Sequence, residues 1–203
     1  MSDKRRLLLI FVKNPEKGKV KTRLAKKIGD KEALNVYRKL LFMTKEVVKD
    51  VDCEKQVWYS SFIPDKDLWN SQTFGKHIQQ GHDLGERMSI AFKNAFQGGA
   101  PKVVLIGSDC AELTKDIIEN AFQALEHSDV VIGPSFDGGY YLLGMSSFEP
   151  DLFENIAWST PSVFEQTIAK AGQLHLSIAM LPRLNDIDTQ EDLRQSDSNL
   201  IDL

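Results

Sequence analysis

The sequence predicts an α/β fold in which a mostly parallel sheet carries helices on both faces. Short segments with unbroken apolar character, such as residues 7–12, are typical of strands that are buried on both faces. Segments with apolar residues at helical spacing alternate with them along the chain. The chain has 203 residues, of which 42% are hydrophobic. This length fits a single domain over residues 1–203.

The first half of the chain shows this alternation. After the strand at 7–12, residues 30–51 form a helix that is capped by its first residue, an aspartate. Residues 56–60 form a second strand. Residues 63–82 are predicted to be irregular, because they are polar and contain proline and glycine. A helix then covers residues 83–97, between an aspartate that opens it and two glycines that end it.

The second half continues the pattern. Residues 102–107 form a strand that is rich in β-branched residues and bounded by glycine. Thr114 caps a helix whose apolar face extends to Leu125. Two further strands cover residues 129–133 and 140–145, and a pair of glycines lies in the turn between them.

The last elements are a helix, a strand and a short helix. Residues 162–172 form the first helix, with Gly172 as its C-cap, and residues 177–181 form the strand. Asp188 or Thr189 caps the final helix. In mostly parallel sheets of this kind, ligands bind at the carboxyl ends of the strands, near the point where the strand order reverses. We therefore examined the loops that follow the strands.

Composition excludes several classes of protein. The net charge of −4 argues against a nucleic-acid binder that works by overall charge. The apolar run at 7–12 is too short for a signal-peptide core or a membrane span, so we expect a cytoplasmic protein without a membrane span. Cys53 and Cys110 are then expected to be free thiols. The four histidines are scattered and indicate no zinc site.

The loop after the first strand is basic. Gly18 would let the backbone approach a ligand, and Lys21 and Arg23 could bind phosphate oxygens. The loop is neither a Walker A motif nor a dinucleotide-binding fingerprint. By itself it fits a phosphate site and a solvated basic loop about equally.

An aspartate ends the strand at 102–107. The carboxylate of Asp109 suits a hard cation such as Mg²⁺ or Mn²⁺, although an isolated aspartate at this position more often caps the following turn. Cys110 is interpreted as a small buried residue, because no histidine or aspartate pattern indicates a nucleophile.

Two later loops also carry carboxylates. Asp137, followed by two glycines and Tyr140, could bind a sugar or nucleoside, or could simply form a hairpin turn. Asp186 and Asp188 point to the same side of an extended segment. One of them could ligate a metal while the other caps the last helix, or both could be turn residues.

Two further segments complete the candidate site. Asp83 and Arg87 lie at a helix N-terminus, where anions are favoured, although a surface ion pair is the ordinary role of such an arginine. Trp158 could line an acceptor pocket together with the two residues that follow it. The alternative is that this tryptophan belongs to the core and that Thr160 precedes a helix that starts at Pro161.

Together, and in this order, the motifs resemble one family. They are Lys13-x-Pro15-x-x-Gly18-x-Val20-Lys21-Thr22-Arg23-Leu24, Gly81-x-Asp83-Leu84-Gly85-Glu86-Arg87-Met88, Gly107-Ser108-Asp109-Cys110, Gly133-Pro134-x-x-Asp137-Gly138-Gly139-Tyr140-Tyr141, Trp158-Ser159-Thr160 and Asp186-Ile187-Asp188-Thr189-x-x-Asp192-Leu193. The family comprises small bacterial and archaeal proteins that were long listed as a domain of unknown function and are regarded as glycosyltransferases. It is more distantly similar to phospholactate and molybdenum-cofactor guanylyltransferases. The resemblance covers residues 7–193. The chain departs from the family pattern at Lys17 and Ala111, where members often have proline.

The resemblance implies a three-layer α/β/α sandwich with the nucleotide-diphospho-sugar transferase (GT-A-like) fold, and a nucleotide over the carboxyl edge of the sheet. We expect the catalytic residues to be Asp109, Asp137 and Lys21. We expect the nucleotide and its phosphates to contact Lys13, Gly18, Lys21, Thr22, Arg23, Asp83 and Arg87. The expected substrate pocket contains Asp137, Gly138, Gly139, Tyr140, Trp158, Ser159 and Thr160. The expected ligands of Mg²⁺ or Mn²⁺ are Asp109 and either Asp186 or Asp188.

Three functions remain open from the sequence. The first is metal-dependent glycosyl transfer from a nucleotide-diphospho-sugar to a small-molecule acceptor. The second is nucleotidyl transfer, in which a phosphorylated small molecule attacks a nucleoside triphosphate and pyrophosphate leaves. The third is nucleotide binding without catalysis, which the several acidic residues at strand ends disfavour.

Overall fold

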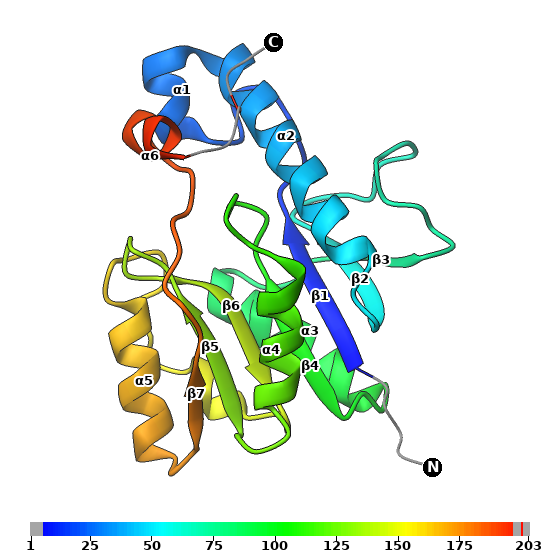
Figure 1. The fold of residues 1–203 in the computed structure, drawn as a ribbon, viewed down its shortest axis with the longest axis vertical. Helices are drawn as coiled ribbons and strands as arrows, with labels where there is room; N and C mark the ends of the chain where they lie inside the picture. Colours follow the sequence, from blue (N-terminus) through cyan, green and yellow to red (C-terminus); the bar gives the residue numbers. More distant parts are fainter. Residues whose placement is uncertain (1–5, 197–199, 201–203) are drawn as a thin grey trace.

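The computed structural model describes residues 6–196 and residue 200 (Figure 1). The strands of this part of the chain form one sheet in the order β3-β2-β1-β4-β6-β5-β7. Their bounds are β1 (Arg6–Val12), β2 (Glu54–Tyr59), β3 (Phe74–Ile78), β4 (Lys102–Ile106), β5 (Val130–Pro134), β6 (Tyr140–Met145) and β7 (Ile178–Met180). All pairs are parallel except those of β6, which runs antiparallel to both β4 and β5. The predicted mostly parallel sheet is confirmed.

Helices cover both faces of the sheet. They are α1 (Thr22–Ile28), α2 (Asp30–Lys49), α3 (Leu84–Gln97), α4 (Lys115–Ala124), α5 (Val163–Gln173) and α6 (Gln190–Gln195), with a short 3₁₀ helix η1 (Pro150–Phe153). Side chains of α2 and α4 pack in one core, and side chains of α3, α5 and η1 pack in the other. The result is the three-layer arrangement that the sequence predicts.

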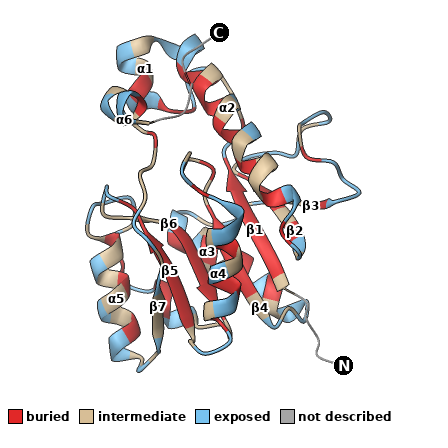
Figure 2. Cartoon of the chain, viewed as in Figure 1, coloured by how far each residue is buried: buried red, intermediate tan, exposed pale blue. Residues whose placement is uncertain are grey.

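Strand β1 shows why its apolar run is unbroken. Leu8 and Ile10 belong to the core beneath α2 and α4, whereas Leu7 and Leu9 belong to the core beneath α3. Because successive side chains of a strand point to opposite faces, a strand that is covered on both sides needs apolar residues at every position. Figure 2 shows this buried centre as the strands between the helical layers.

A third apolar cluster lies beyond the carboxyl edge of the sheet. There α1, the start of α2 and α6 lie side by side (Figure 1). Buried residues from all three segments form it, among them Leu24, Leu40 and Leu193. This cluster joins an early and a late part of the chain above the sheet.

Several predicted boundaries need correction. Residues 74–78 form strand β3 inside the segment that we expected to be irregular. In the part of the chain that the structure describes, this strand lies at the edge of the sheet and pairs only with β2. Its polar side chains stay partly exposed, so it lacks an apolar run. Helix α1 follows the basic loop and was not predicted. The sequence analysis also did not identify η1.

The helix caps agree with the prediction at four of six positions, one of which is the C-cap of α3 at Gly98. Asp83, Thr114 and Thr189 each accept a backbone hydrogen bond at the start of their helices, and Thr189 forms a capping box with Asp192. The predicted cap at Asp30 is wrong, because this residue is already helical and the cap is a glycine without a side-chain hydrogen bond. The predicted stop at Gly172 is also wrong.

Helix α5 runs one residue past Gly172, and the left-handed backbone that follows the helix is at His175. Within the described residues, none of the helices is both long enough and apolar enough to span a bilayer.

Candidate active site

A cavity of about 530 Å³ opens at the carboxyl edge of the sheet. From β1 the chain passes to β2 and β3 on one side, and it later returns to β4 on the other side. The loops that leave β1 and β4 therefore diverge and leave a crevice between them, as is usual where strand order reverses. Loops after β5 and β7 close the cavity on the side of β6.

Most of the predicted site residues line this one cavity. They are Lys13, Lys21, Thr22, Arg23, Asp109, Asp137, Gly139, Tyr140, Trp158, Ser159, Thr160, Asp186 and Asp188. Gly18, Gly138, Asp83 and Arg87 are not among the lining residues. The structure thus brings together loops that are far apart in the sequence, although the roles of these residues stay predictions.

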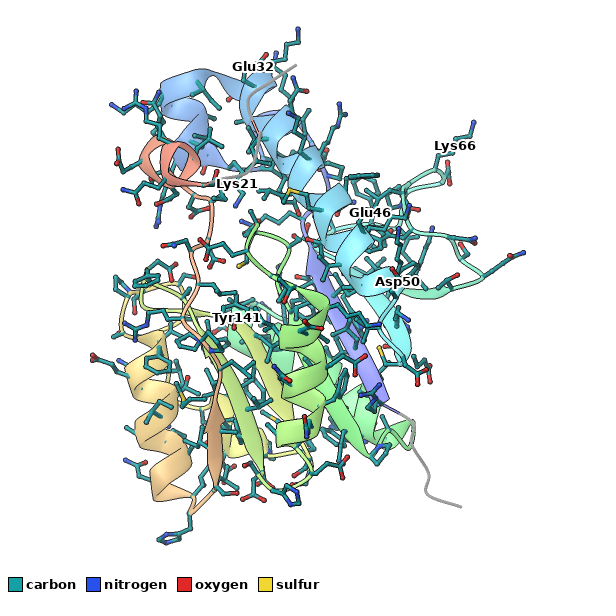
Figure 3. All side chains as sticks on the ribbon, in the orientation of Figure 1. Lys21, Glu32, Glu46, Asp50, Lys66 and Tyr141 are labelled. Atoms are coloured by element: carbon teal, nitrogen blue, oxygen red, sulfur yellow. The ribbon has the colours of Figure 1, made fainter. Side chains whose placement is uncertain are left out.

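Lys21, labelled in Figure 3, lies between two carboxylates that line the cavity. Its backbone is left-handed, with φ of 47°, and its side chain is 2% exposed. The Nζ atom lies 2.9 Å from Oδ1 of Asp109 and 3.2 Å from Oδ1 of Asp188. Burial alone would lower the pKa of Lys21, but the two carboxylates outweigh it and raise the pKa above its ordinary value. The side chain is therefore a fixed cation that the two aspartates share.

Asp186 lies beside this ion-pair group. Its backbone forms an isolated antiparallel bridge with Cys110, and the next N–H, of Ile187, donates to the carbonyl of Asp109 at 3.0 Å. Burial, followed by repulsion from Asp109 and Asp137, raises the pKa of Asp186 to about 7. Within the described part of the chain, its carboxylate forms no hydrogen bond or ion pair. Asp186 is the acidic side chain of the cavity that is least compensated.

The loop between β5 and β6, which the sequence allowed to be a hairpin turn or part of a site, forms a turn and also lines the cavity. Oδ1 of Asp137 accepts hydrogen bonds from Ser135 Oγ and from the Gly139 N–H at 2.9 Å, so this carboxylate stabilises the turn while it lines the cavity. Gly138 has φ of 89°, and a Cβ there would lie 2.0 Å from the carbonyl oxygen of Pro161. Glycine is required at this position by both the turn and the packing of the neighbouring loop.

The two predicted aromatic residues are partly core residues. Among the described residues, the buried Oη atom of Tyr140 has no hydrogen-bond partner, so a ligand in the cavity would contact this tyrosine through its ring. The ring of Trp158 packs against Phe153, with centroids 6.3 Å apart, and against the start of α3 at Gly85. Trp158 therefore packs against the core and also lines the cavity, and its contact with an acceptor stays a prediction.

Sequence reasoning did not identify Tyr37 and Ser108 as part of the site. From α2, Oη of Tyr37 accepts the Lys13 N–H at 2.7 Å and lies 3.1 Å from Oγ of Ser108. It therefore ties together the loops that follow β1 and β4. The sequence could have indicated Tyr37, because it is a tyrosine on an otherwise apolar helix face. A buried tyrosine needs a hydrogen-bond partner for its hydroxyl group. Lys19 and Gln79 also line the cavity.

The predicted residues outside the cavity have other contacts. Asp83 caps α3 by accepting the Glu86 N–H at 2.8 Å, and Nε of Arg87 donates to the Gly81 carbonyl at 3.1 Å. Gly18 lies in the basic loop with φ of 77°, and its closest non-neighbour is the Asp30 side chain. These contacts order the loop before α3 and the loop before α1.

The chemistry of the remaining groups limits what the cavity can do. Burial raises the pKa of the Cys110 thiol to about 12, so this cysteine is not a nucleophile at neutral pH. Among the described residues, no three His, Cys, Asp or Glu side chains are arranged as a ready-made metal site. The carboxylates converge, but Lys21 stands between two of them.

A mostly parallel sheet, an antiparallel β6 and a charged crevice at the switch point define the class of nucleotide-diphospho-sugar transferase folds. Within this class, the model of a family described as uncharacterized proteins conserved in bacteria (DUF2064) matches residues 43–160, which is more than half of the chain. The chain belongs to this family, as its motifs suggest. No protein of curated function matches the sequence.

Solved structures agree with this assignment. A candidate nucleotide-diphospho-sugar transferase from Desulfovibrio desulfuricans G20 is 36% identical, with a TM-score of 0.85 over 96% of this chain and 89% of that chain. CMP:2-keto-3-deoxy-manno-octonic acid synthetase, solved with CTP, is 10% identical, with a TM-score of 0.55 over 94% and 96% of the two chains.

Glucosyl-3-phosphoglycerate synthase from Mycobacterium tuberculosis, solved with Mn²⁺, UDP and glucosyl-3-phosphoglycerate, is 11% identical. Its TM-score is 0.52 over 91% of this chain and 71% of that chain. The identities of the last two proteins are low enough that they show a shared fold alone.

Proposed function

We propose that this protein is a transferase that uses a nucleotide-diphospho-sugar donor together with a divalent cation. The observation that carries the proposal is the composition of the cavity at the switch point, which we call the nucleotide cavity after its proposed ligand. Four cationic side chains line it, and they are Lys13, Lys19, Lys21 and Arg23. Four carboxylates line it as well, and they are Asp109, Asp137, Asp186 and Asp188.

This balance of charge argues for a metal ion. The cationic and acidic side chains that line the cavity are equal in number, so the cavity has no surplus positive charge for a diphosphate. A divalent cation between the carboxylates and the diphosphate would supply it. Carboxylate oxygens are the ligands that Mg²⁺ and Mn²⁺ prefer. The donor set therefore fits such an ion, although it is not preassembled.

Asp109 and Asp186 are the best candidates to hold that ion. Among the described residues, Asp186 forms no ion pair, whereas Asp188 already pairs with Lys21 and, at 3.6 Å, with Arg23. When bound, the cation would stabilise the charge on the departing nucleoside diphosphate. The Mn²⁺ complex of glucosyl-3-phosphoglycerate synthase, which has the same fold, supports the use of a divalent metal.

The other side chains would bind and orient the substrates. Arg23 is exposed and suits bidentate binding of diphosphate oxygens, and Lys21 would keep the adjacent carboxylate in place. The ring of Trp158 would pack on the sugar or the base. Asp137, held by its turn, would orient the acceptor hydroxyl and accept its proton.

Nucleotidyl transfer is the second candidate. The observation that favours it is the run of cations on the single loop that leaves β1, since a triphosphate carries more charge than a diphosphate. The CTP complex of CMP:2-keto-3-deoxy-manno-octonic acid synthetase adds support through the shared fold. The two candidates differ in their donor, so ligand binding separates them.

Thermal unfolding with nucleoside triphosphates and nucleotide sugars, each with and without Mn²⁺, tests the proposal. A ligand at a hundred times its Kd adds about 2.7 kcal/mol, which raises Tm by a few degrees. We expect a nucleotide sugar to raise Tm only when Mn²⁺ is present. We expect Asp109→Asn to abolish the effect, whereas Asp116→Asn, on exposed α4 surface, should retain it.

Stabilisation by a triphosphate alone would replace glycosyl transfer with nucleotidyl transfer. No shift with any member of the panel would contradict a nucleotide donor altogether.

A further inference from the structure

A second cavity of about 500 Å³ lies on the other side of the loop that follows β1. Its walls come from α2, from this loop and from residues 60–73, the long connection between β2 and β3. Val12 and Lys13 line both cavities, so the two share a wall. No part of the proposed transfer reaction uses the second cavity.

The loop at 60–73 is firmly built, although it contains no regular element. Trp69 is 2% exposed and packs edge-on against Phe74, with ring centroids 5.1 Å apart. The buried Asn14 holds the loop from the other side. Its Nδ2 donates to the Phe62 carbonyl at 2.8 Å, and its Oδ1 accepts the Ser61 N–H at 3.0 Å. Connections of this length are uncommon in compact domains and are often functional.

The charges of this cavity do not cancel. Of its two carboxylates, Glu16 pairs with Lys19 at 3.0 Å and Asp67 pairs with Lys76 at 2.8 Å. The cations that line the cavity are Lys13, Arg38 and Lys66, the last labelled on the loop in Figure 3. Among the described residues, the side chains of these three have no ion pair or hydrogen bond. The cavity therefore keeps a surplus of positive charge.

Its walls are otherwise apolar and aromatic. Phe42 and Phe62 are 56% and 46% exposed, which is unusual for side chains of this size. Leu41 and Leu68 also line the cavity. A ligand that matches these walls has an apolar body, and a ligand that matches the surplus charge is an anion. A second copy of this chain fits less well, because it would bring the same unpaired cations to the contact.

We infer that this cavity is a binding site for a small organic anion with an apolar body, separate from the nucleotide cavity. Arg38 would bind the anionic group, since a guanidinium can form two hydrogen bonds with a carboxylate, sulfonate or phosphate. Phe42, Phe62 and Trp69 would cover the apolar body. This inference does not depend on the proposed transfer reaction, and a separate binding measurement tests it.

The test uses two fluorescent probes of nearly the same shape. 1-Anilinonaphthalene-8-sulfonate carries a negative charge, and N-phenyl-1-naphthylamine is neutral. We expect the native protein to bind one equivalent of the charged probe. We expect Arg38→Gln to weaken that binding about tenfold, which is the value of one charge-assisted contact. Arg38→Gln should leave the affinity for the neutral probe unchanged, whereas Phe42→Ala should weaken the binding of both probes.

Two control variants locate the probe. Arg23→Gln alters the nucleotide cavity, and Lys93→Gln removes an exposed charge on α3. Both should bind the charged probe like the parent protein. The inference is overturned if the parent protein does not bind the probe, if Arg38→Gln binds it normally, or if Arg23→Gln loses it. It is also overturned if sedimentation shows a dimer that Phe42→Ala dissociates, because the cavity would then be a subunit interface.

Discussion

Lys21 is the residue on which the charged side of the nucleotide cavity depends. It is the buried cation between Asp109 and Asp188, and its backbone adopts a conformation that L-residues rarely take. In this conformation the ammonium group lies against two carboxylates that line the cavity. Backbone strain of this kind persists only where the surrounding structure enforces it, and it is typical of functional sites. The left-handed backbone of Lys21 therefore supports a functional role for its side chain.

Replacing this lysine should expose the repulsion that it suppresses. We expect Lys21→Met to lower the free energy of unfolding by about 1–3 kcal/mol, because two carboxylates lose their shared counter-ion. This expected loss is smaller than the loss for a fully buried ion pair, because both aspartates are partly exposed. Urea unfolding in EDTA measures it. Lys26→Met, at an exposed position of α1, is the control, and an equal loss in both variants would contradict the role of Lys21.

The two thiols should be unreactive in the native state. Burial raises the pKa of Cys53 to about 11 and that of Cys110 to about 12, from a reference value of 9.0. Two pKa units correspond to about a hundredfold less thiolate at pH 8. We expect iodoacetamide to alkylate both residues at least that much more slowly than it does in urea, with a rate that rises with pH. Rapid labelling of native Cys110 at pH 8 would show that it is accessible.

The same shifts affect stability at high pH. Because the folded pKa values lie above the unfolded ones, the folded protein holds these protons more tightly. The two protonated thiols therefore make their full contribution to the free energy of unfolding below pH 9. This contribution is lost as the pH rises towards 11 or 12.

At the scale of elements, the start of α3 fixes one wall of the nucleotide cavity. Helix α3 approaches the ring of Trp158 so closely at Gly85 that a Cβ there would lie 2.0 Å from Nε1 of the indole. No rotation of a methyl group relieves such an overlap, so the indole or the helix must move. Gly85 thus couples the position of an element to the shape of the site.

We therefore expect Gly85→Ala to destabilise the protein by about 1–3 kcal/mol and to weaken ligand binding in the nucleotide cavity. Gly172→Ala is the matched control, because a Cβ at that helical position has no neighbour within 4 Å. It should stabilise α5 by up to about 1 kcal/mol, since alanine is the better helix former. Thermal unfolding distinguishes the opposite signs, and stabilisation by both changes would show that the Trp158 ring accommodates the methyl group.

The elements also show how far sequence reasoning reaches. Strands buried on both faces, such as β1 and β4, follow from unbroken apolar runs, and the caps at Asp83 and Thr114 follow from side-chain chemistry. Strand β3 does not follow from its sequence, because an edge strand with one neighbour needs no apolar pattern. Its pairing depends on β2, the strand before it in the chain, and on the path of the connection at residues 60–73 that separates the two.

At the scale of the whole molecule, the apolar cluster of α1, α2 and α6 holds the upper wall of the nucleotide cavity. Leu193 belongs to it and is buried, and α6 begins two residues after Asp188, with Thr189 as its cap. We expect Leu193→Ala to cost about 2–4 kcal/mol locally and to speed hydrogen exchange in both α1 and α6. Arg194→Ala, an exposed change on the same helix, should do neither. Unchanged exchange in α1 would mean that the two helices open independently.

The candidate site could also be predicted only in part, because some of its contacts arise from how the elements pack. Aspartates and basic residues that follow strands were placed correctly at one edge, because parallel strands bring their carboxyl ends together. Tyr37 was not recognised, since its contacts with two loops arise from the packing of α2 across the sheet. The second cavity likewise depends on how residues 60–73 fold back over α2.

The apolar cluster has a consequence for how the protein is made. Ribosomes release chains from the amino end, so the cations of residues 13–23 emerge long before Asp186 and Asp188. Until those aspartates arrive, Lys21 lacks one of its two carboxylate partners and α1 lacks α6. A nascent chain would thus present an open, positively charged edge to the nucleotides and RNA of the cell. The charged cavity can be completed only after residues 186–193 have been synthesised.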